Sequence, residues 1–130
     1  MQIGNQMTIE AWIKPTRSAP TESQFIAQLG ASGSAIFLVS STDCAGKTTN
    51  TLGFFQTSCA NSVYSNEAVP VNVWTHIAVT ADSSANQVHI YFNHVDKTGT
   101  VPSNVVISFG TGMTASNAIM RFGGFEGCST

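Results

Sequence analysis

Charged side chains are scarce in this sequence of 130 residues. Asp, Glu, Lys and Arg make up 9% of it, against about 25% in an ordinary soluble domain. Five basic residues and a formal net charge of -2 leave no basic patch to neutralise phosphates, which argues against nucleic acid or an anionic membrane surface as a partner. We expect the surface to be solvated by Ser, Thr and Asn, which account for 39 of the 130 residues.

Long apolar runs are missing as well. No apolar stretch approaches the roughly 20 residues of a spanning helix, so no membrane insertion is expected. The start, MQIGNQMTIEAW, lacks the basic, apolar and small-residue parts of a secretory signal, and we interpret the chain as a piece of a larger protein. Its length suits one domain with two facing sheets, and we therefore predict a single domain over residues 1–130.

Closely spaced acids are also missing, because no two of the seven Asp and Glu residues lie within five residues of each other. Glycoside hydrolysis needs two carboxyl groups facing each other across a cleft, and no G-x-S-x-G motif offers a nucleophilic serine. We therefore predict that the protein is not an enzyme. In the hydrolase alternative the best residue is Glu10, which could meet His76 as an acid-base pair, although a structural hydrogen bond between them is the favoured interpretation.

Cysteine is limited to Cys44, Cys59 and Cys128, which allow three single pairings. Cys44 and Cys59 flank a Gly/Thr/Asn-rich loop between two strand-like runs, where neighbouring antiparallel strands could bring them within bridging distance. We predict that these two residues form a disulfide. The bond implies an oxidising compartment, and hence an extracellular or cell-surface location. The alternative is three inert, unpaired cysteines.

Strand-like alternation is what the sequence has in quantity, and helical periodicity does not appear. The clearest stretch is VWTHIAVTADSSANQVHIYFNH, residues 73–94, where two alternating runs flank the short polar turn 82–86. This pattern predicts a β-hairpin. Further strands are predicted over residues 8–14, 25–29, 36–39, 52–57, 62–65, 105–109 and 118–122.

Three blocks of this sequence resemble the laminin G-like domains of the concanavalin A-like lectin and glucanase group. Residues 7–15 (MTIEAWIKP) are similar to the first core strand of that family, and residues 120–127 (MRFGGFEG) to its late Gly-Gly block. The family's central signature is similar to Pro70, Trp74, Thr75, His76, Ala78, Val79, Thr80, Asp82, Tyr91 and Asn93.

The resemblance implies an all-β fold, an antiparallel β-sandwich of jelly-roll type that lacks terminal strands. It also implies that Trp12 and Trp74 pack in the core. His94 departs from the pattern, since the family usually has Gly there, so we expect this residue either to accept a positive φ or to use another turn.

The function implied by the resemblance is non-catalytic recognition of a carbohydrate or an extracellular protein, through rim loops at residues 40–51 and 81–87. A sugar offers an apolar face rimmed by hydroxyl groups, so its sites combine aromatic rings with amides. The candidate ligand-binding residues are Tyr64, His89, Tyr91, Asn93, Asn61 and Asn66.

No cofactor is expected from the residues, and the three histidines lack the spacing of a zinc site. The resemblance does imply a calcium ion, for which Asp82, Asn86 and Asp43 are the candidate oxygen ligands. The alternative is that they only form turns.

A second functional hypothesis is an assembly module of a larger surface or virion-associated protein. Its incomplete sheet would be completed by a strand from a homo-oligomer or a neighbouring domain.

Overall fold

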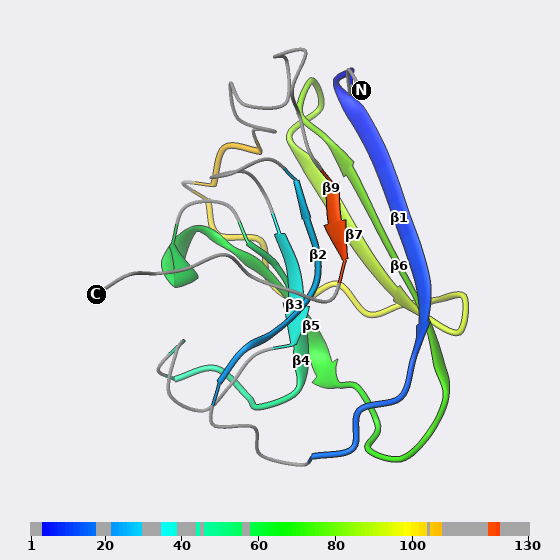
Figure 1. Cartoon of the computed structure of the whole chain (residues 1–130). Coiled ribbons are helices and arrows are strands. Elements are labelled where there is room, and N and C mark those ends of the chain that lie inside the picture. The colour runs from blue at the N-terminus through cyan, green and yellow to red at the C-terminus, as the bar shows by residue number, and fades with distance from the viewer. Residues whose placement is uncertain are drawn as a thin grey trace.

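In the computed structural model the chain forms two antiparallel β-sheets that face each other (Figure 1). The structure describes residues 4–17, 22–29, 35–38, 44, 46–55, 58–103, 105–107 and 120–122. The strand order is β1-β6-β7-β8 in one sheet, here called sheet A, and β5-β4-β3-β2-β9 in the other, sheet B. The predicted all-β antiparallel sandwich is confirmed.

Sheet A contains the hairpin that the alternation predicts. Its strands are β1 (Gln6–Ile13), β6 (Thr75–Asp82), β7 (Gln87–Phe92) and β8 (Val95–Asp96). Along β6 buried and half-buried residues alternate without interruption, as expected for a strand with one face on the core. β6 pairs with β1 on one side and with β7 on the other, so it lies in the interior of the sheet.

Sheet B forms the second layer. Its strands are β2 (Gln24–Leu29), β3 (Ala35–Leu38), β4 (Thr51–Phe55), β5 (Val63–Ala68) and β9 (Met120–Phe122). In the described part of the chain the one helical segment is the short 3-10 helix η1 (Cys59–Asn61), and none of its helices is long and apolar enough to cross a bilayer.

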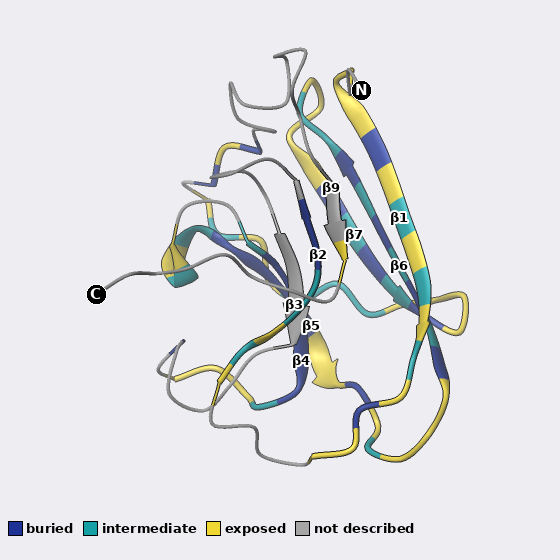
Figure 2. Cartoon of the chain, in the orientation of Figure 1, coloured by how far each residue is buried: buried dark blue, intermediate teal, exposed yellow. Residues whose placement is uncertain are grey.

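The core lies between the sheets and is made of the inward-facing apolar residues of both. Figure 2 shows the buried positions recurring along the strands that face the interior. The largest of its fully buried apolar side chains are Phe54, Leu52, Ile77, Ile90, Ile107, Val63, Val69 and Val79. Phe54 and Phe55 point to opposite faces of sheet B, as predicted, because consecutive strand residues alternate.

The strand predicted over residues 105–109 does not form in its described part, residues 105–107. The burial of these residues still alternates, with Val105 and Ile107 buried and Val106 exposed. The side chain of Asn86 takes the place of a neighbouring strand: its Nδ2 donates to the Val105 carbonyl at 2.9 Å, and its Oδ1 accepts from the Ile107 amide at 2.6 Å. A side-chain amide therefore satisfies the backbone groups that a ladder would otherwise pair.

A two-residue turn joins β7 to β8. Asn93 and His94 both have positive φ, 47° and 69°, the combination found in a type I′ hairpin turn. His94 thus accepts the left-handed region at a position where glycine is the easier residue. The turn is tied to β6, because Asn93 Oδ1 accepts from the His76 amide at 3.0 Å and the Asn93 amide donates to the His76 carbonyl at 2.9 Å.

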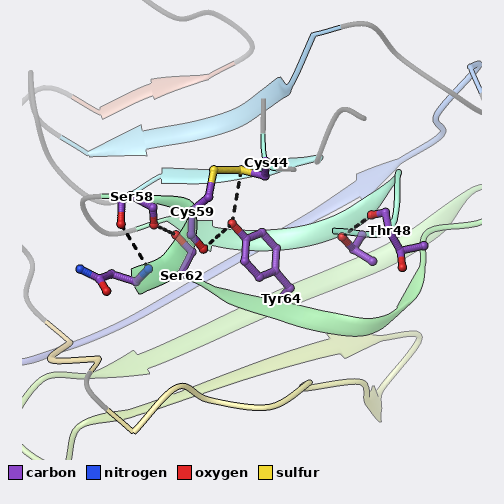
Figure 3. The surroundings of a disulfide bond; sticks show 8 residues. Cys44, Thr48, Ser58, Cys59, Ser62 and Tyr64 are labelled. Carbon is purple, nitrogen blue, oxygen red and sulfur yellow. Dashed lines mark hydrogen bonds between the residues drawn. A yellow bond between two sulfur atoms is a disulfide. The ribbon is translucent and has the colours of Figure 1, made fainter. Parts of the chain in front are cut away.

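The predicted disulfide is present. Cys44 and Cys59 are bonded with their Cα atoms 5.5 Å apart, and Figure 3 shows the bond beside Tyr64. Cys128 lies outside the described residues. The bond is compatible with an extracellular location.

Candidate functional site

The predicted ligand-binding residues fall on two different sheets and do not form one site. Asn61 ends η1, and Tyr64 and Asn66 lie on β5 of sheet B. His89 and Tyr91 lie on β7 of sheet A, with Asn93 in the turn that follows. In the second group, His89 and Tyr91 are alternate residues of β7 and share a face.

Tyr64, one of the candidate ligand-binding residues, is buried. Only 7% of its surface is accessible, because it packs in a small cluster with Cys44, Cys59, Phe25 and Phe55. Its hydroxyl donates to the Cys59 carbonyl at 3.0 Å (Figure 3), and burial raises the pKa of its phenol. The ring therefore supports the disulfide and cannot offer a face to a sugar.

The two asparagines on this side do not compensate. Asn61 is half-buried, and its backbone amide donates to Ser58 Oγ at 3.3 Å. Asn66 is exposed on β5, and its backbone amide donates to the Lys97 carbonyl at 2.8 Å. Without the ring of Tyr64, this part of sheet B has no stacking surface among the predicted residues.

The face of sheet A that points away from the core carries a different set of side chains. We call it the outer face of sheet A. Alternation places on it every second residue of β1, β6 and β7, opposite the buried set, and the register aligns them in rows. Its members are Gln6, Thr8, Glu10, Trp12, His76, Ala78, Thr80, Asp82, Gln87, His89, Tyr91 and Asp96.

One row of this face is a group of three rings. Trp12 pairs with His76 across β1 and β6, with ring centroids 5.3 Å apart, and the imidazole of His94 stacks on His76 at 5.4 Å. Trp12 is 64% exposed and Trp74, just before β6, is 61% exposed. The prediction that both indoles pack in the core is therefore wrong. Trp12 follows the alternation of β1, which turns it away from the interior.

A second aromatic pair lies on β7. The rings of His89 and Tyr91 stack with centroids 6.1 Å apart. His89 Nδ1 lies 3.2 Å from Asp96 Oδ2 on β8. The other oxygen of Asp96 accepts from the Thr98 hydroxyl at 2.6 Å and the Thr98 amide at 2.8 Å. These bonds, chiefly that of the Thr98 hydroxyl, lower the pKa of the Asp96 carboxyl, so the carboxylate is held in its charged form.

Glu10 and His76 do meet, with His76 Nε2 3.3 Å from Glu10 Oε2. His76 is mostly buried and its Nδ1 has no hydrogen-bond partner among the described residues, whereas the Glu10 side chain is 65% exposed. A carboxylate acceptor requires the proton on Nε2, which fixes the ring's orientation beside Trp12. The pair thus positions the aromatic row.

Two of the predicted calcium ligands, Asp82 and Asn86, make hydrogen bonds within the fold. Asp82 Oδ1 accepts from the Ser84 hydroxyl and amide and from the Ala85 amide, and its Oδ2 accepts from Gln6 at 2.7 Å. The amide of Asn86 is engaged with the backbone of residues 105 and 107. Asp43 lies outside the described residues, which contain no cluster of three or more His, Cys, Asp or Glu side chains able to hold a metal. Calcium binding stays a prediction.

Asp82 gives the β6–β7 turn a testable pH dependence. Its hydrogen bonds, first that of the Ser84 hydroxyl, lower its pKa from 3.8 to about 2. A folded-state pKa below the unfolded value adds stability above pH 3.8 that is lost as the pH falls toward about 2. We expect Asp82→Ala to lower the Tm at neutral pH and the difference from wild type to shrink below pH 4.

Thermal unfolding of both proteins across this pH range measures the effect. Glu22→Ala, which removes an exposed carboxylate before β2, controls for the change in net charge. A Tm difference that stays constant down to pH 2 would contradict the assignment.

Comparison with known proteins adds the family. No curated protein matches the sequence. A model of the laminin G type, described as the concanavalin A-like lectin/glucanases superfamily, matches residues 1–119. This match covers the central hairpin, the strand that carries Trp12 and both disulfide cysteines. The chain is therefore a member of the concanavalin A-like lectin/glucanase superfamily, with a domain of the laminin G type.

Proposed function

We propose that this domain is a non-catalytic recognition module that binds a carbohydrate on the outer face of sheet A. The observation that carries the proposal is the exposed indole of Trp12 beside the imidazoles of His76 and His94. An exposed aromatic ring offers the flat apolar surface on which the C–H face of a sugar stacks. A group of adjacent exposed rings is more informative than a single exposed apolar residue, because contiguous apolar surface marks interaction sites.

The polar groups around these rings complete the arrangement. Glu10 accepts from His76 and remains accessible, and Thr8 and Thr80 present hydroxyl groups in the next rows of the face. Such groups, held in place by the sheet, can exchange hydrogen bonds with sugar hydroxyls. In this proposal the ligand contact lies on the strands, where backbone pairing keeps the side chains in register.

The non-catalytic part of the proposal rests on the same geometry. The Glu10 carboxylate is held against His76 and is open to solvent, whereas a glycosidase needs a second carboxyl group across a cleft. Among the described residues of the outer face the other acids are Asp82 and Asp96, and both accept hydrogen bonds from neighbouring hydroxyl and amide groups. We also propose an extracellular setting, which the disulfide supports.

Replacing Trp12 with alanine tests the binding surface. We expect Trp12→Ala to weaken glycan binding by about tenfold or more, since truncating a central aromatic contact commonly costs 2 kcal/mol or more. The measurement is a glycan array followed by calorimetric titration of the best ligand. Trp74→Ala is the matched control, because that indole is equally exposed but lies outside the four strands. Equal losses in both variants, or an array with no bound glycan, would contradict the proposal.

A specific observation favours the assembly module as a second function. The His76 amide and carbonyl both bond to Asn93, so they point toward β7. The N–H and C=O groups of successive residues in an antiparallel strand point to opposite sides of that strand. The groups of Ala11 therefore point toward β6, and the groups of the residues before and after it in the sequence point to the other edge of β1. In the described part of the chain β6 is the one strand that pairs with β1. The outward groups belong to Gln6, Thr8, Glu10 and Trp12.

A second copy of the chain could add its own strand to this edge. If it does, the protein elutes as a dimer in size-exclusion chromatography with light scattering. Thr8→Pro removes one outward N–H and leaves the β1–β6 ladder intact, so we expect it to yield monomers. Ala11→Pro is the control, because it removes a ladder hydrogen bond and destabilises the fold. A wild-type protein that stays monomeric at high concentration would contradict this function.

A further inference from the structure

The charged residues in the strands of the outer face of sheet A are all acidic. Its four strands contain three acids, Glu10, Asp82 and Asp96, and neither Lys nor Arg. Lys97, immediately after β8, has its ammonium group 2.9 Å from the Glu67 carboxylate and is engaged there. Lys14 lies just beyond the end of β1. Within its strands the outer face therefore carries three carboxylates and no fixed positive charge, and the nearest ammonium group along β1 is that of Lys14, two residues after Trp12.

Hydrogen bonds hold two of these carboxylates, Asp82 and Asp96, in their charged form. The pKa of Asp82 is about 2, and that of Asp96 is lowered by the Thr98 hydroxyl and amide. The side chains of Glu10 and Asp96 are 65% and 49% exposed, so both contribute negative potential at the surface where a ligand would lie. Repulsion between these carboxylates and a negatively charged ligand disfavours binding of that ligand. A sulfate or carboxylate group on a sugar would meet this potential without an arginine or lysine in the strands to offset it.

The rings are spaced for more than one sugar. Tyr91 lies two strands across from Trp12 and one outer-face row along. With strands 4.8 Å apart and 3.4 Å per residue, their Cα atoms are about 12 Å apart. Ala78 on β6 pairs with both Glu10 and Tyr91. Its side chain is small and projects only a short way from the sheet between these two residues. A single sugar ring is too short to contact both aromatic residues.

From these observations we infer that the ligand is a neutral glycan of at least two sugar units that lies across β1, β6 and β7 over Ala78. The inference rests on the proposed function and adds the ligand's charge and length. Neutral sugars are not repelled by the carboxylates. Their hydroxyl groups can donate hydrogen bonds to these carboxylates, and such bonds are strong because the acceptor is charged.

The experiment is calorimetric titration of the whole chain with neutral hexose oligosaccharides, from monosaccharide to hexasaccharide, and with chemically sulfated forms of the same chains. We expect the neutral forms to bind at least tenfold more tightly, with affinity rising from monosaccharide to disaccharide. Their affinity should change less than twofold when salt is added, because neutral ligands are not screened. Ala78→Gln places a longer side chain between the aromatic residues and should lower the affinity for the longer neutral chains by about tenfold.

Glu10→Gln tests the charge directly. It keeps a hydrogen-bond acceptor for His76 and removes one carboxylate, so the preference for neutral over sulfated chains should fall by about threefold, on the scale of exposed charge interactions. Glu22→Gln makes the same chemical change away from sheet A and should leave the preference unchanged.

The outcomes separate the two claims. Sulfated chains that bind more tightly than neutral ones, with Trp12 still required, would overturn this inference and leave the proposed function standing. A monosaccharide that binds as tightly as the disaccharide would overturn the length. No binding of either class would overturn both the inference and the proposed function.

Discussion

Replacing Phe54 with alanine is expected to lower the free energy of unfolding by about 3–5 kcal/mol. Phe54 lies on β4 with no accessible surface, in register with Ile36 and Val63 and packed in the core between the two sheets. Truncation removes its buried ring and leaves a cavity that the paired strands cannot close.

Urea denaturation measures this loss from the shift in midpoint at constant slope. Phe122→Ala is the matched control, because that ring on β9 is 69% exposed, and its removal should change stability by no more than about 0.5 kcal/mol. A loss below about 1 kcal/mol for Phe54→Ala would show that the two sheets do not pack through this residue.

Removing the disulfide is the second large effect. Cys44 and Cys59 are 15 residues apart and lie on either side of β4 in the sequence, so the bond closes a loop that contains this strand, which pairs with β3 and β5. Constraining a loop of this size in the unfolded chain contributes about 3 kcal/mol. We expect the double variant Cys44→Ala/Cys59→Ala to be less stable by that amount, and the reduced wild-type protein to match it.

Denaturation with and without reductant makes the comparison. Tyr64→Phe is a useful reference, since it removes only the hydroxyl bonded to the Cys59 carbonyl and should cost about 0.5–1.5 kcal/mol. If the reductant leaves the wild-type unfolding curve unchanged, the bond does not contribute as described.

Local patterns predicted the strands well because period-two alternation is a property of neighbouring residues. The hairpin of β6 and β7 was expected from residues 73–94, and β1 from the strand predicted over residues 8–14. Alternation within that strand puts Trp12 on the face with Glu10, opposite Ile9 and Ala11. The family resemblance suggested a buried indole instead, and here the local pattern was the better guide.

Long-range contacts were beyond the sequence. Tyr64 is buried because the disulfide and η1 cover it, which no pattern within β5 indicates. Asn86 was a candidate metal ligand because of its place in a turn, yet its side chain reaches residues about 20 positions later. The pairing of Glu10 with His76 was predicted as a structural hydrogen bond. The stacking of His94 on His76 could not be predicted, because it depends on the positive φ of a turn residue.

A titration of isotope-labelled protein with the best neutral oligosaccharide from the array, followed by NMR, locates a ligand on the outer face of sheet A. We expect the largest chemical-shift changes on the Trp12 indole N–H and on the amides of His76, Ala78 and Tyr91. Changes confined to the turn at residues 83–86, or to sheet B around Tyr64, would contradict this expectation.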